Sequence, residues 1–178
     1  MKIMSRAEFK ELAKEYPYYR KRWHYFKKVI DILQETSFES CLELGPYKRP
    51  MVHGCDVIDI RKHLDNLTYR HDATKTPWPI DDAKYDLFIA LQVWEHLQDK
   101  QQDAFREVMR IAKKAILSFP LNWNFAGDMH NGITEKKISE WTLNIEPTRK
   151  IKAVKWHLSV RHPVKKFSRA RLICLYEF

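Results

Sequence analysis

Residues 41–50, Cys-Leu-Glu-Leu-Gly-Pro-Tyr-Lys-Arg-Pro, decide the fold of this chain. A short apolar run ends at an acidic residue, a single glycine and then residues that favour turns. This is the pattern of a buried strand that enters a sharp turn. Gly45 removes a side chain at the point where the backbone must turn tightly or lie against a ligand. We therefore expect the rest of the chain to build the sheet and helices that hold this turn.

Apolar runs that follow this turn alternate with segments of helical periodicity. Strands are expected at 40–44, 55–60, 67–71, 85–91 and 115–119, and near 151–158 and 170–177. Helices, with apolar residues at steps of three and four, are expected at 5–16, 19–33, 95–112 and 134–143. The alternation predicts an α/β fold: a Rossmann-like open twisted sheet of about seven strands, mostly parallel with an antiparallel edge strand, and helices on both faces.

Length and composition favour one soluble globular domain over residues 1–178, with an N-terminal helical segment at 1–36 and an α/β core at 37–178. No apolar run approaches the roughly 20 residues that span a bilayer, and the first residues lack the apolar region of a signal peptide. The three cysteines are odd in number and have no metal-like spacing. A reducing cytoplasm fits this pattern best, so we expect a cytoplasmic protein without a membrane partner.

The net charge of +9 is distributed unevenly along the sequence. It is +3 for residues 1–40, −2 for residues 41–110 and +8 for residues 111–178. A basic surface attracts nucleic acid or an anionic substrate, although solvated surface charge is the commoner explanation. Nucleic-acid binding through the basic C-terminal region, which includes residues 161–166, therefore stays open.

Each of the first four expected parallel strands ends in a polar or small group. Ligands of open α/β sheets bind outside the carboxyl ends of the strands. The carboxylate of Asp59 can accept hydrogen bonds from the two vicinal hydroxyls of a ribose. Asp72 can accept a bond from the exocyclic amine of adenine, and Ala73 leaves room for a flat ring. Each aspartate also has an ordinary interpretation, Asp59 as a turn residue and Asp72 as an Asx cap of the following turn.

These motifs, in this order, resemble the class I S-adenosylmethionine-dependent methyltransferases, of the small type 11 kind. The resemblance covers roughly residues 40–122. It rests on Leu-Glu-Leu-Gly at 42–45, Val-Ile-Asp at 57–59, His-Asp-Ala at 71–73, Tyr-Asp-Leu-Phe at 85–88, Val-Trp-Glu-His-Leu at 93–97, Phe-Arg-Glu-Val-Met-Arg at 105–110 and Ala-Ile-Leu-Ser-Phe-Pro at 115–120. The segment 93–97, after a buried strand, is its most specific part.

The resemblance implies an enzyme that transfers the methyl group of S-adenosyl-L-methionine to an acceptor. Glu43 and Gly45 would line the methionine portion of the cofactor, Asp59 would bind the ribose hydroxyls, and Gln92 would form the wall beside the reactive methyl group. The implied cofactor-binding residues are Glu43, Gly45, Pro46, Tyr47, Asp59, Asp72, Ala73, Leu91 and Gln92.

The first turn departs from the family pattern, which has a second and often a third glycine. Pro46, Tyr47 and Lys48 stand there instead, and the connection to the next strand, residues 45–55, is at the lower limit of about 10–12 residues for a parallel crossover. We expect a tight irregular crossover without a full helix. Lys48 or Arg49 would supply positive charge near the cofactor. Loss of cofactor binding is the alternative.

Methyl transfer from a sulfonium requires chiefly that the acceptor be aligned, and also that its proton be removed if it is a hydroxyl or an ammonium group. The candidate catalytic bases are Glu95, His96 and His130. The aperiodic segment 120–132 predicts a loop over the acceptor, with Trp123, Phe125, Asp128 and Met129 beside His130. No metal site is expected, because the histidines are scattered along the sequence.

The leading hypothesis is methyl transfer to a small-molecule acceptor. The alternatives are an RNA or DNA methyltransferase, or a catalytically inactive interaction protein on the same fold. The Asn-Pro-Pro-aromatic or Asp-Pro-Pro-aromatic motif of amino-methylating nucleic-acid enzymes is missing, because Gln-Val-Trp-Glu stands at residues 92–95.

Overall fold

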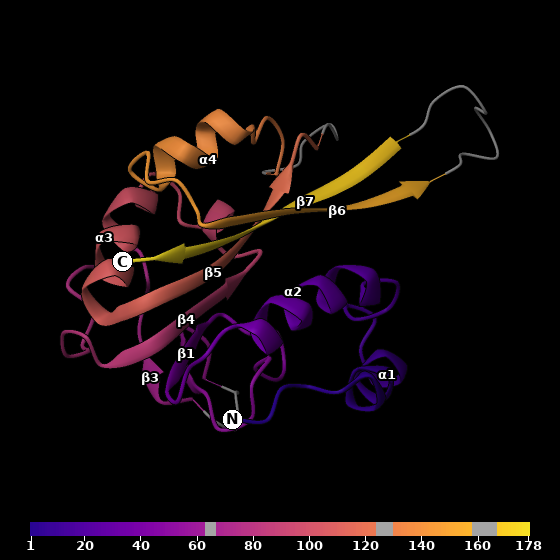
Figure 1. The fold of residues 1–178 in the computed structure, drawn as a ribbon, viewed down its shortest axis with the longest axis horizontal. Helices are drawn as coiled ribbons and strands as arrows, with labels where there is room; N and C mark the ends of the chain where they lie inside the picture. Colours follow the sequence, from indigo (N-terminus) through magenta and orange to yellow (C-terminus); the bar gives the residue numbers. More distant parts are fainter. Residues whose placement is uncertain (63–66, 124–129, 158–166) are drawn as a thin grey trace.

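The computed structural model describes residues 1–62, 67–123, 130–157 and 167–178. Within them the chain forms a seven-stranded sheet with the strand order β3-β2-β1-β4-β5-β7-β6 (Figure 1). The strands are β1 Cys41–Leu44, β2 Asp56–Asp59, β3 Tyr69–Arg70, β4 Tyr85–Leu91, β5 Ala112–Leu121, β6 Arg149–His157 and β7 Phe167–Glu177.

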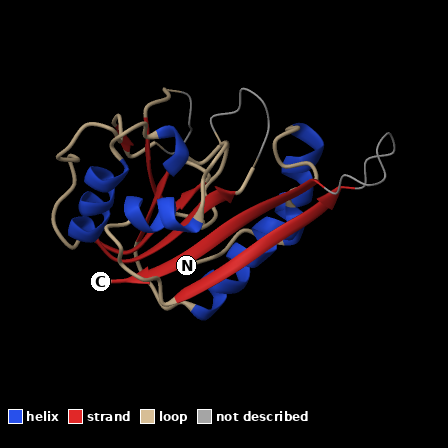
Figure 2. Ribbon diagram, turned by 90° about the horizontal axis from the view of Figure 1, so that it is seen from above, coloured by secondary structure: helices blue, strands red, loops and turns tan. Residues whose placement is uncertain are grey.

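The first five strands pair in parallel, and β7 runs antiparallel to both of its neighbours, β5 and β6. The expected Rossmann-like sheet of about seven mostly parallel strands is thus confirmed. Its antiparallel strand lies second from the edge, and Figure 2 shows β6 and β7 side by side. The strand order reverses at β1, which lies between β2 and β4, so the carboxyl ends of these three strands are where such sheets bind ligands.

The helices are α1 Arg6–Glu15, α2 Trp23–Glu35, α3 Gln101–Ile111 and α4 Glu135–Trp141, with a 3₁₀ turn η1 at Trp94–His96. Helix α1 begins with a capping box, in which Ser5 Oγ accepts from the amide of Glu8 and the Glu8 carboxylate accepts from the amide of Ser5. The helix expected over 95–112 is divided into η1 and α3. Gln98 lies between them with a φ of 57°, outside the helical range. No helix in the described parts of the chain is long and apolar enough to cross a bilayer.

Alternate residues of β4 explain why helices cover both faces of the sheet. Leu87 and Ile89 pack into a core with α2, whereas Phe88 and Ala90 pack into a second core with α3 and α4. Figure 1 shows α2 on one side of the strands and α3 and α4 on the other. A strand buried on both faces needs apolar residues at every position, which is why residues 87–91 are continuously apolar.

The connection from β1 to β2 is the short irregular crossover that the sequence predicts. Residues 45–55, all of which the structure describes, contain no helix. The N-terminal residues lie along this crossover: the amide of Met4 donates to the carbonyl of Met51 at 2.8 Å, and Ile3 forms a β-bridge with Val52. Met51 and Val52 are buried, so this crossover is a packed part of the core beside β1.

Candidate cofactor and acceptor site

The turns after β1 and β4 touch each other at Gly45. Its φ is 67°, a conformation that favours glycine, and its amide donates to the carbonyl of Ile58 at 3.0 Å. A Cβ added at Gly45 would lie 3.0 Å from Cγ2 of Val93. The absence of a side chain therefore lets the ends of β1, β2 and β4 meet.

Glu43 lies at the centre of this meeting point and is almost completely buried. Its Oε2 accepts a hydrogen bond of 2.6 Å from the amide of Met51. Burial raises the pKa of Glu43 to about 8, and the bond from Met51 opposes this increase only in part. At neutral pH the group is therefore mainly a protonated acid that holds the crossover.

Asp59 lies at the carboxyl end of β2, and Arg61 holds its carboxylate. Arg61 Nε donates to both carboxylate oxygens at 3.0 and 3.1 Å, and a terminal nitrogen lies 2.5 Å from Oδ2. That nitrogen also donates to the carbonyl of Pro46 at 2.7 Å. The amide of Arg61 donates to Asp59 Oδ1 at 2.8 Å, as in an Asx turn, so the turn interpretation of Asp59 describes its present contacts. Sequence reasoning missed Arg61, although an arginine two residues after the strand end was visible.

Asp72 and Ala73 follow β3, which pairs with β2 so that the amide of His71 donates to the carbonyl of Asp59 at 3.1 Å. Asp72 Oδ1 accepts from the amide and the hydroxyl of Thr74 at 3.0 and 2.7 Å. These bonds lower the pKa of Asp72. The Asx cap anticipated from the sequence is therefore present, beside the strand end that carries Asp59.

Four tyrosines cover the end of β1. The rings of Tyr18 and Tyr47 stack with their centroids 4.4 Å apart, and the edges of Tyr16 and Tyr19 meet Tyr47 at 6.3 and 6.0 Å. They leave a cavity of about 10 Å³, which holds about one water molecule. Its lining includes Glu43, Gly45, Pro46, Tyr47, Arg49 and Leu91.

The carboxylates at these strand ends are suitable acceptors for the ribose hydroxyls and the adenine amine of an adenosyl cofactor. The methionine end of such a cofactor needs more room than the stacked rings of Tyr18 and Tyr47 leave. Lys48 Nζ lies 4.9 Å from the centroid of the Tyr16 ring, over its face, on the same tyrosine cluster.

Gln92, which follows β4, is fixed by contacts from two other strands. Its φ is 58°, and its amide bonds to the carbonyl and to the hydroxyl of Ser118 on β5, each at 3.1 Å. Arg171 Nε, on β7, donates to Gln92 Oε1 at 3.0 Å. Arg171 is buried, and its guanidinium lies 5.1 Å from the ring centroids of Tyr25 and of Trp123. Sequence reasoning missed Arg171, whose signal was a single charge within the apolar strand.

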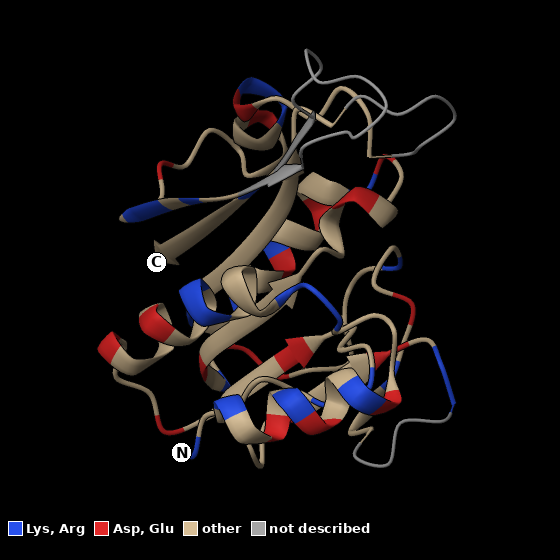
Figure 3. Ribbon diagram, turned by 90° about the vertical axis from the view of Figure 1, so that its right-hand side faces the viewer, with Lys and Arg blue, Asp and Glu red and all other residues tan. Residues whose placement is uncertain are grey.

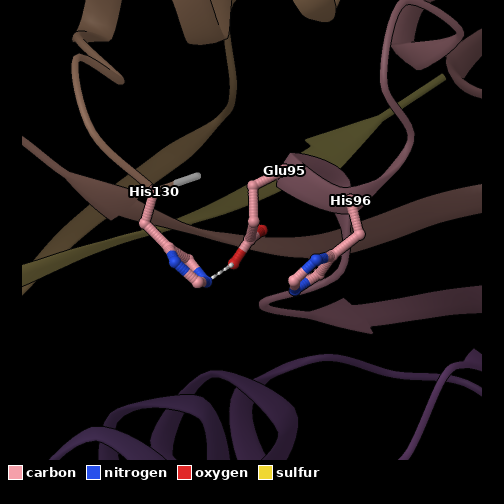
Figure 4. A group of neighbouring side chains, drawn as sticks. All are labelled: Glu95, His96 and His130. Carbon is pink, nitrogen blue, oxygen red and sulfur yellow. Dashed lines mark ion pairs between the residues drawn. The ribbon is translucent and has the colours of Figure 1, made fainter. Parts of the chain in front are cut away.

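The three candidate bases lie together, as Figure 4 shows. The side chain of Glu95 on η1 is fully buried, and its Oε1 lies 3.7 Å from Nε2 of His130. The rings of His96 and His130 are 5.4 Å apart and nearly perpendicular. His130 also lies 5.3 Å from the ring of Trp123, which connects this group to Arg171 and Gln92. The expected loop residues Phe125, Asp128 and Met129 lie outside the described residues.

Figure 3 marks Lys and Arg in blue and Asp and Glu in red along the ribbon, and both colours occur on several helices of the side shown. On β6, Lys150 and Lys152 pair with Glu146 and Glu135 at 2.8 and 2.6 Å, and Arg149 pairs with Glu35. Part of the C-terminal excess of positive charge is therefore neutralised locally. Residues 161–166, the basic segment singled out in the sequence, lie outside the described residues.

Comparison with known proteins supports the resemblance on which the fold prediction rested. The sequence model of a family described as "Methyltransferase domain" matches residues 51–116. No curated protein matches the chain.

Solved structures with this fold include the N-methyltransferase NodS from Bradyrhizobium japonicum WM9, with a TM-score of 0.60 at 14% identity over 90% of this chain and 96% of that one. A structure of NodS in complex with S-adenosyl-l-homocysteine matches with a TM-score of 0.59 at 13% identity, over 90% and 87% of the two chains. A SAM-dependent methyltransferase from Aquifex aeolicus matches with a TM-score of 0.53 at 14% identity, over 97% and 98%.

The structural matches support the fold described above, and the family match covers the segment that contains β2, β3, β4 and the Glu95–His96 pair. S-adenosylmethionine is the cofactor of this class. Residues 51–116 of the chain thus match the methyltransferase-domain family, and the chain has the fold of solved S-adenosylmethionine-dependent methyltransferases.

Proposed function

We propose that this enzyme transfers the methyl group of S-adenosylmethionine to a small-molecule acceptor that binds beside Glu95, His96 and His130. The observation that carries the proposal is the grouping of Glu95 and His96, which follow β4, with His130, which follows β5. The group lies at the same edge of the sheet as the strand ends that carry Glu43 and Asp59. Beyond the sheet and its covering helices, the described chain adds mainly α1. This leaves little surface for a separate macromolecular recognition element.

The bound cofactor supplies a methyl group on a sulfonium, so the protein has chiefly to align an acceptor behind that carbon. Asp59 would accept hydrogen bonds from the ribose hydroxyls and Asp72 from the adenine amine. Gln92, held by Arg171, would form a fixed wall near the reactive carbon. Nε2 of His130 would take a proton from the acceptor, and the buried carboxylate of Glu95 would stabilise the resulting imidazolium.

Asp59 cannot bind the ribose in this way while Arg61 occupies both of its oxygens. Cofactor binding would therefore exchange the guanidinium for the two hydroxyls. Because Arg61 also bonds to the carbonyl of Pro46, its release would loosen the turn that carries Tyr47. The same movement would thus release the Asp59 carboxylate and allow the Tyr47 ring to move away from Gly45.

Two substitutions test the ribose assignment. Asp59→Ala should weaken the binding of S-adenosylhomocysteine by about 10- to 100-fold, because bonds to a charged acceptor contribute about 1.5–3 kcal/mol. Arg61→Ala should leave the affinity unchanged or increase it, because the competing donor is removed. Isothermal titration calorimetry measures both. Equal affinity of the Asp59→Ala and wild-type proteins would remove the ribose assignment, and no heat from the wild type would remove the proposal.

A polynucleotide acceptor is the second candidate, and the net charge of +9 favours it. The ion pairs on β6 reduce the positive charge that the described part of this region offers to phosphates. We therefore rank it below a small molecule.

A further inference from the structure

Two segments far apart in the sequence bring a carboxylate and two imidazoles to one place. Glu95 and His96 come from η1, and His130 comes from the segment that follows β5. One ligand atom from each of these residues lies within 4.8 Å of the others. We propose that Glu95, His96 and His130 bind a divalent transition-metal ion. This inference keeps the proposed methyl transfer but replaces the assignment of His130 as the proton acceptor, because an imidazole nitrogen that binds a metal ion cannot also take a proton.

The ligand set determines which ions fit. Two imidazoles and one carboxylate are suited to Zn²⁺, Fe²⁺ or Mn²⁺, whereas Mg²⁺ prefers oxygen ligands alone. Three protein ligands also leave at least one coordination position for water or for an oxygen of the acceptor. The site would therefore select a transition-metal ion, most readily one that tolerates a four-coordinate arrangement.

The ligand atoms of these three residues are slightly farther apart than they would be around a bound metal ion. With metal–ligand bonds of about 2.0–2.1 Å at tetrahedral angles, the ligand atoms lie about 3.3 Å apart. Here Glu95 Oε1 and His130 Nε2 are 3.7 Å apart, and no pair within the group exceeds 4.8 Å.

The backbone on both sides of the group is held by hydrogen bonds. In η1, the amide of His96 donates to the carbonyl of Val93 at 2.9 Å. In the other segment, the amide of Asn122 donates to the carbonyl of Ile133 at 2.9 Å, and Trp123 forms a β-bridge with Asn131, the neighbour of His130. Ligands carried by fixed backbone keep their relative positions, as a metal site requires.

Charge and burial also favour a cation at this position. The side chain of Glu95 has no exposed surface, and a carboxylate removed from water is costly unless a positive charge compensates it. His130 compensates it only when the imidazole is protonated. A divalent ion would compensate the carboxylate while both imidazoles stay neutral, which is the form in which they bind metals.

The test is titration of the full-length protein with Zn²⁺, Mn²⁺ and Mg²⁺ by calorimetry, and with Co²⁺ by visible absorption, in the absence of cofactor and acceptor. We expect one Zn²⁺, Mn²⁺ or Co²⁺ per chain and no comparable Mg²⁺ binding. Glu95→Gln and His130→Ala should each weaken binding more than tenfold. His53→Ala is the matched control, because His53 Nε2 also pairs with a glutamate, Glu8, at 2.9 Å, outside this group. It should bind the ions as the wild type does.

The proposal fails if the wild type binds none of the three transition-metal ions, if both Glu95→Gln and His130→Ala retain its affinity, or if His53→Ala loses as much affinity as they do. Thermal melting without metal checks that each variant is folded. If the Glu95→Gln variant does not fold, the His130→Ala variant alone decides the test. His130 is partly exposed, so its removal should leave the fold intact. Binding of S-adenosylhomocysteine is measured separately. If the protein binds S-adenosylhomocysteine but no metal ion, only this inference is overturned. If it binds a metal ion but no S-adenosylhomocysteine, only the proposed function is overturned.

Discussion

Glu43 is a carboxyl group that the fold removes from water at the end of the central strand β1. Its pKa of about 8 means that the folded protein retains a proton that the unfolded chain, with an ordinary pKa of 4.5, has already lost. The stability contributed by this difference is complete below pH 4.5. This contribution to stability decreases as the pH rises towards 8, because Glu43 then loses its proton in the folded state as well.

Glu43→Gln should remove this pH dependence. Glutamine keeps an oxygen that can accept from Met51 and does not titrate. The free energy of unfolding of the wild type should fall, relative to that of the variant, by at most about 5 kcal/mol between pH 4.5 and 8, since one pKa unit corresponds to 1.36 kcal/mol. Urea unfolding at pH 5, 6.5 and 8 measures it.

Glu107→Gln is the matched control for this experiment. Burial is the strongest single influence on the pKa of Glu107 and acts to raise it, but the hydrogen bonds and charge of Arg110 and the bond from the amide of Trp78 together outweigh burial and lower it. The stability from Glu107 is therefore present above its ordinary pKa and is lost only in more acid solution, so its removal should not change the slope between pH 5 and 8. Parallel profiles for the wild type and Glu43→Gln would contradict the assignment of a raised pKa.

For single residues, the sequence indicates which side chains are candidates for the site, but it does not indicate which residues hydrogen-bond to them. Asp59, Gln92 and Glu95 were recognisable because they follow buried strands. The partners Arg61 and Arg171 were not, because their roles depend on where a turn and a distant antiparallel strand place them. His130 lies 34 residues after His96, a separation that carries no spacing signal, and only the folded chain brings the two together.

Among the elements, the short connection before α2 and the crossover after β1 close over the cofactor side together. Tyr18 contributes one ring from the first, and Tyr47 contributes the other from the second. Tyr47 is partly exposed, so its ring lies at the outer boundary of the small cavity beside Gly45. In the proposed mode of cofactor binding, the Tyr18–Tyr47 pair is therefore a cover that the cofactor would have to displace.

Tyr47→Ala should accelerate the association of S-adenosylhomocysteine by about two- to tenfold, because a stacked aromatic pair contributes about 0.5–1.5 kcal/mol. Stopped-flow tryptophan fluorescence measures the association rate. Phe178→Ala removes a comparably exposed ring that stacks on Tyr176, on the far end of β7, and should leave the rate unchanged. Slower or weaker binding by Tyr47→Ala would instead mean that Tyr47 contacts the cofactor, as the family resemblance implied.

The hydrophobic pattern predicted the positions of the strands and helices well, but it did not predict where each of them begins and ends. The strands at 85–91 and 40–44 were expected almost where β4 and β1 lie, because each is a mainly apolar run that ends at a turn. The helix expected over 95–112 missed the break at Gln98, since Leu97 and Phe105 share an apolar face across the turn. A left-handed residue of this kind leaves no mark in a hydrophobic pattern.

For the molecule as a whole, the excess of positive charge is the property that most affects the choice of acceptor. We expect only weak binding of polyuridylate, with a slope of log K against log salt shallower than about −2, equivalent to fewer than three phosphates neutralised. The reason is the pairing of β6 cations with nearby carboxylates. Fluorescence anisotropy at several salt concentrations between about 20 and 200 mM provides the slope. Polyglutamate serves as an anion without bases, and a steep slope with polyuridylate alone would favour a nucleic-acid acceptor.

The topology itself was within reach of the sequence, because strand–helix alternation allows few arrangements of a parallel sheet. The position of β7 between β5 and β6 was less accessible. Its pairing with Leu117 and Phe119 of β5 spans more than 50 residues, and either of the two late strands could have taken the edge.

The insertion of β7 has a consequence for how this enzyme is made in the cell. A nascent chain on the ribosome can assemble the parallel strands early, but β5 keeps an unpaired apolar edge until β7 has been translated. Arg171 reaches Gln92 only at that moment. Synthesis therefore leaves an interval in which the apolar edge of β5 is exposed, and the contact that fixes Gln92 forms only at its end.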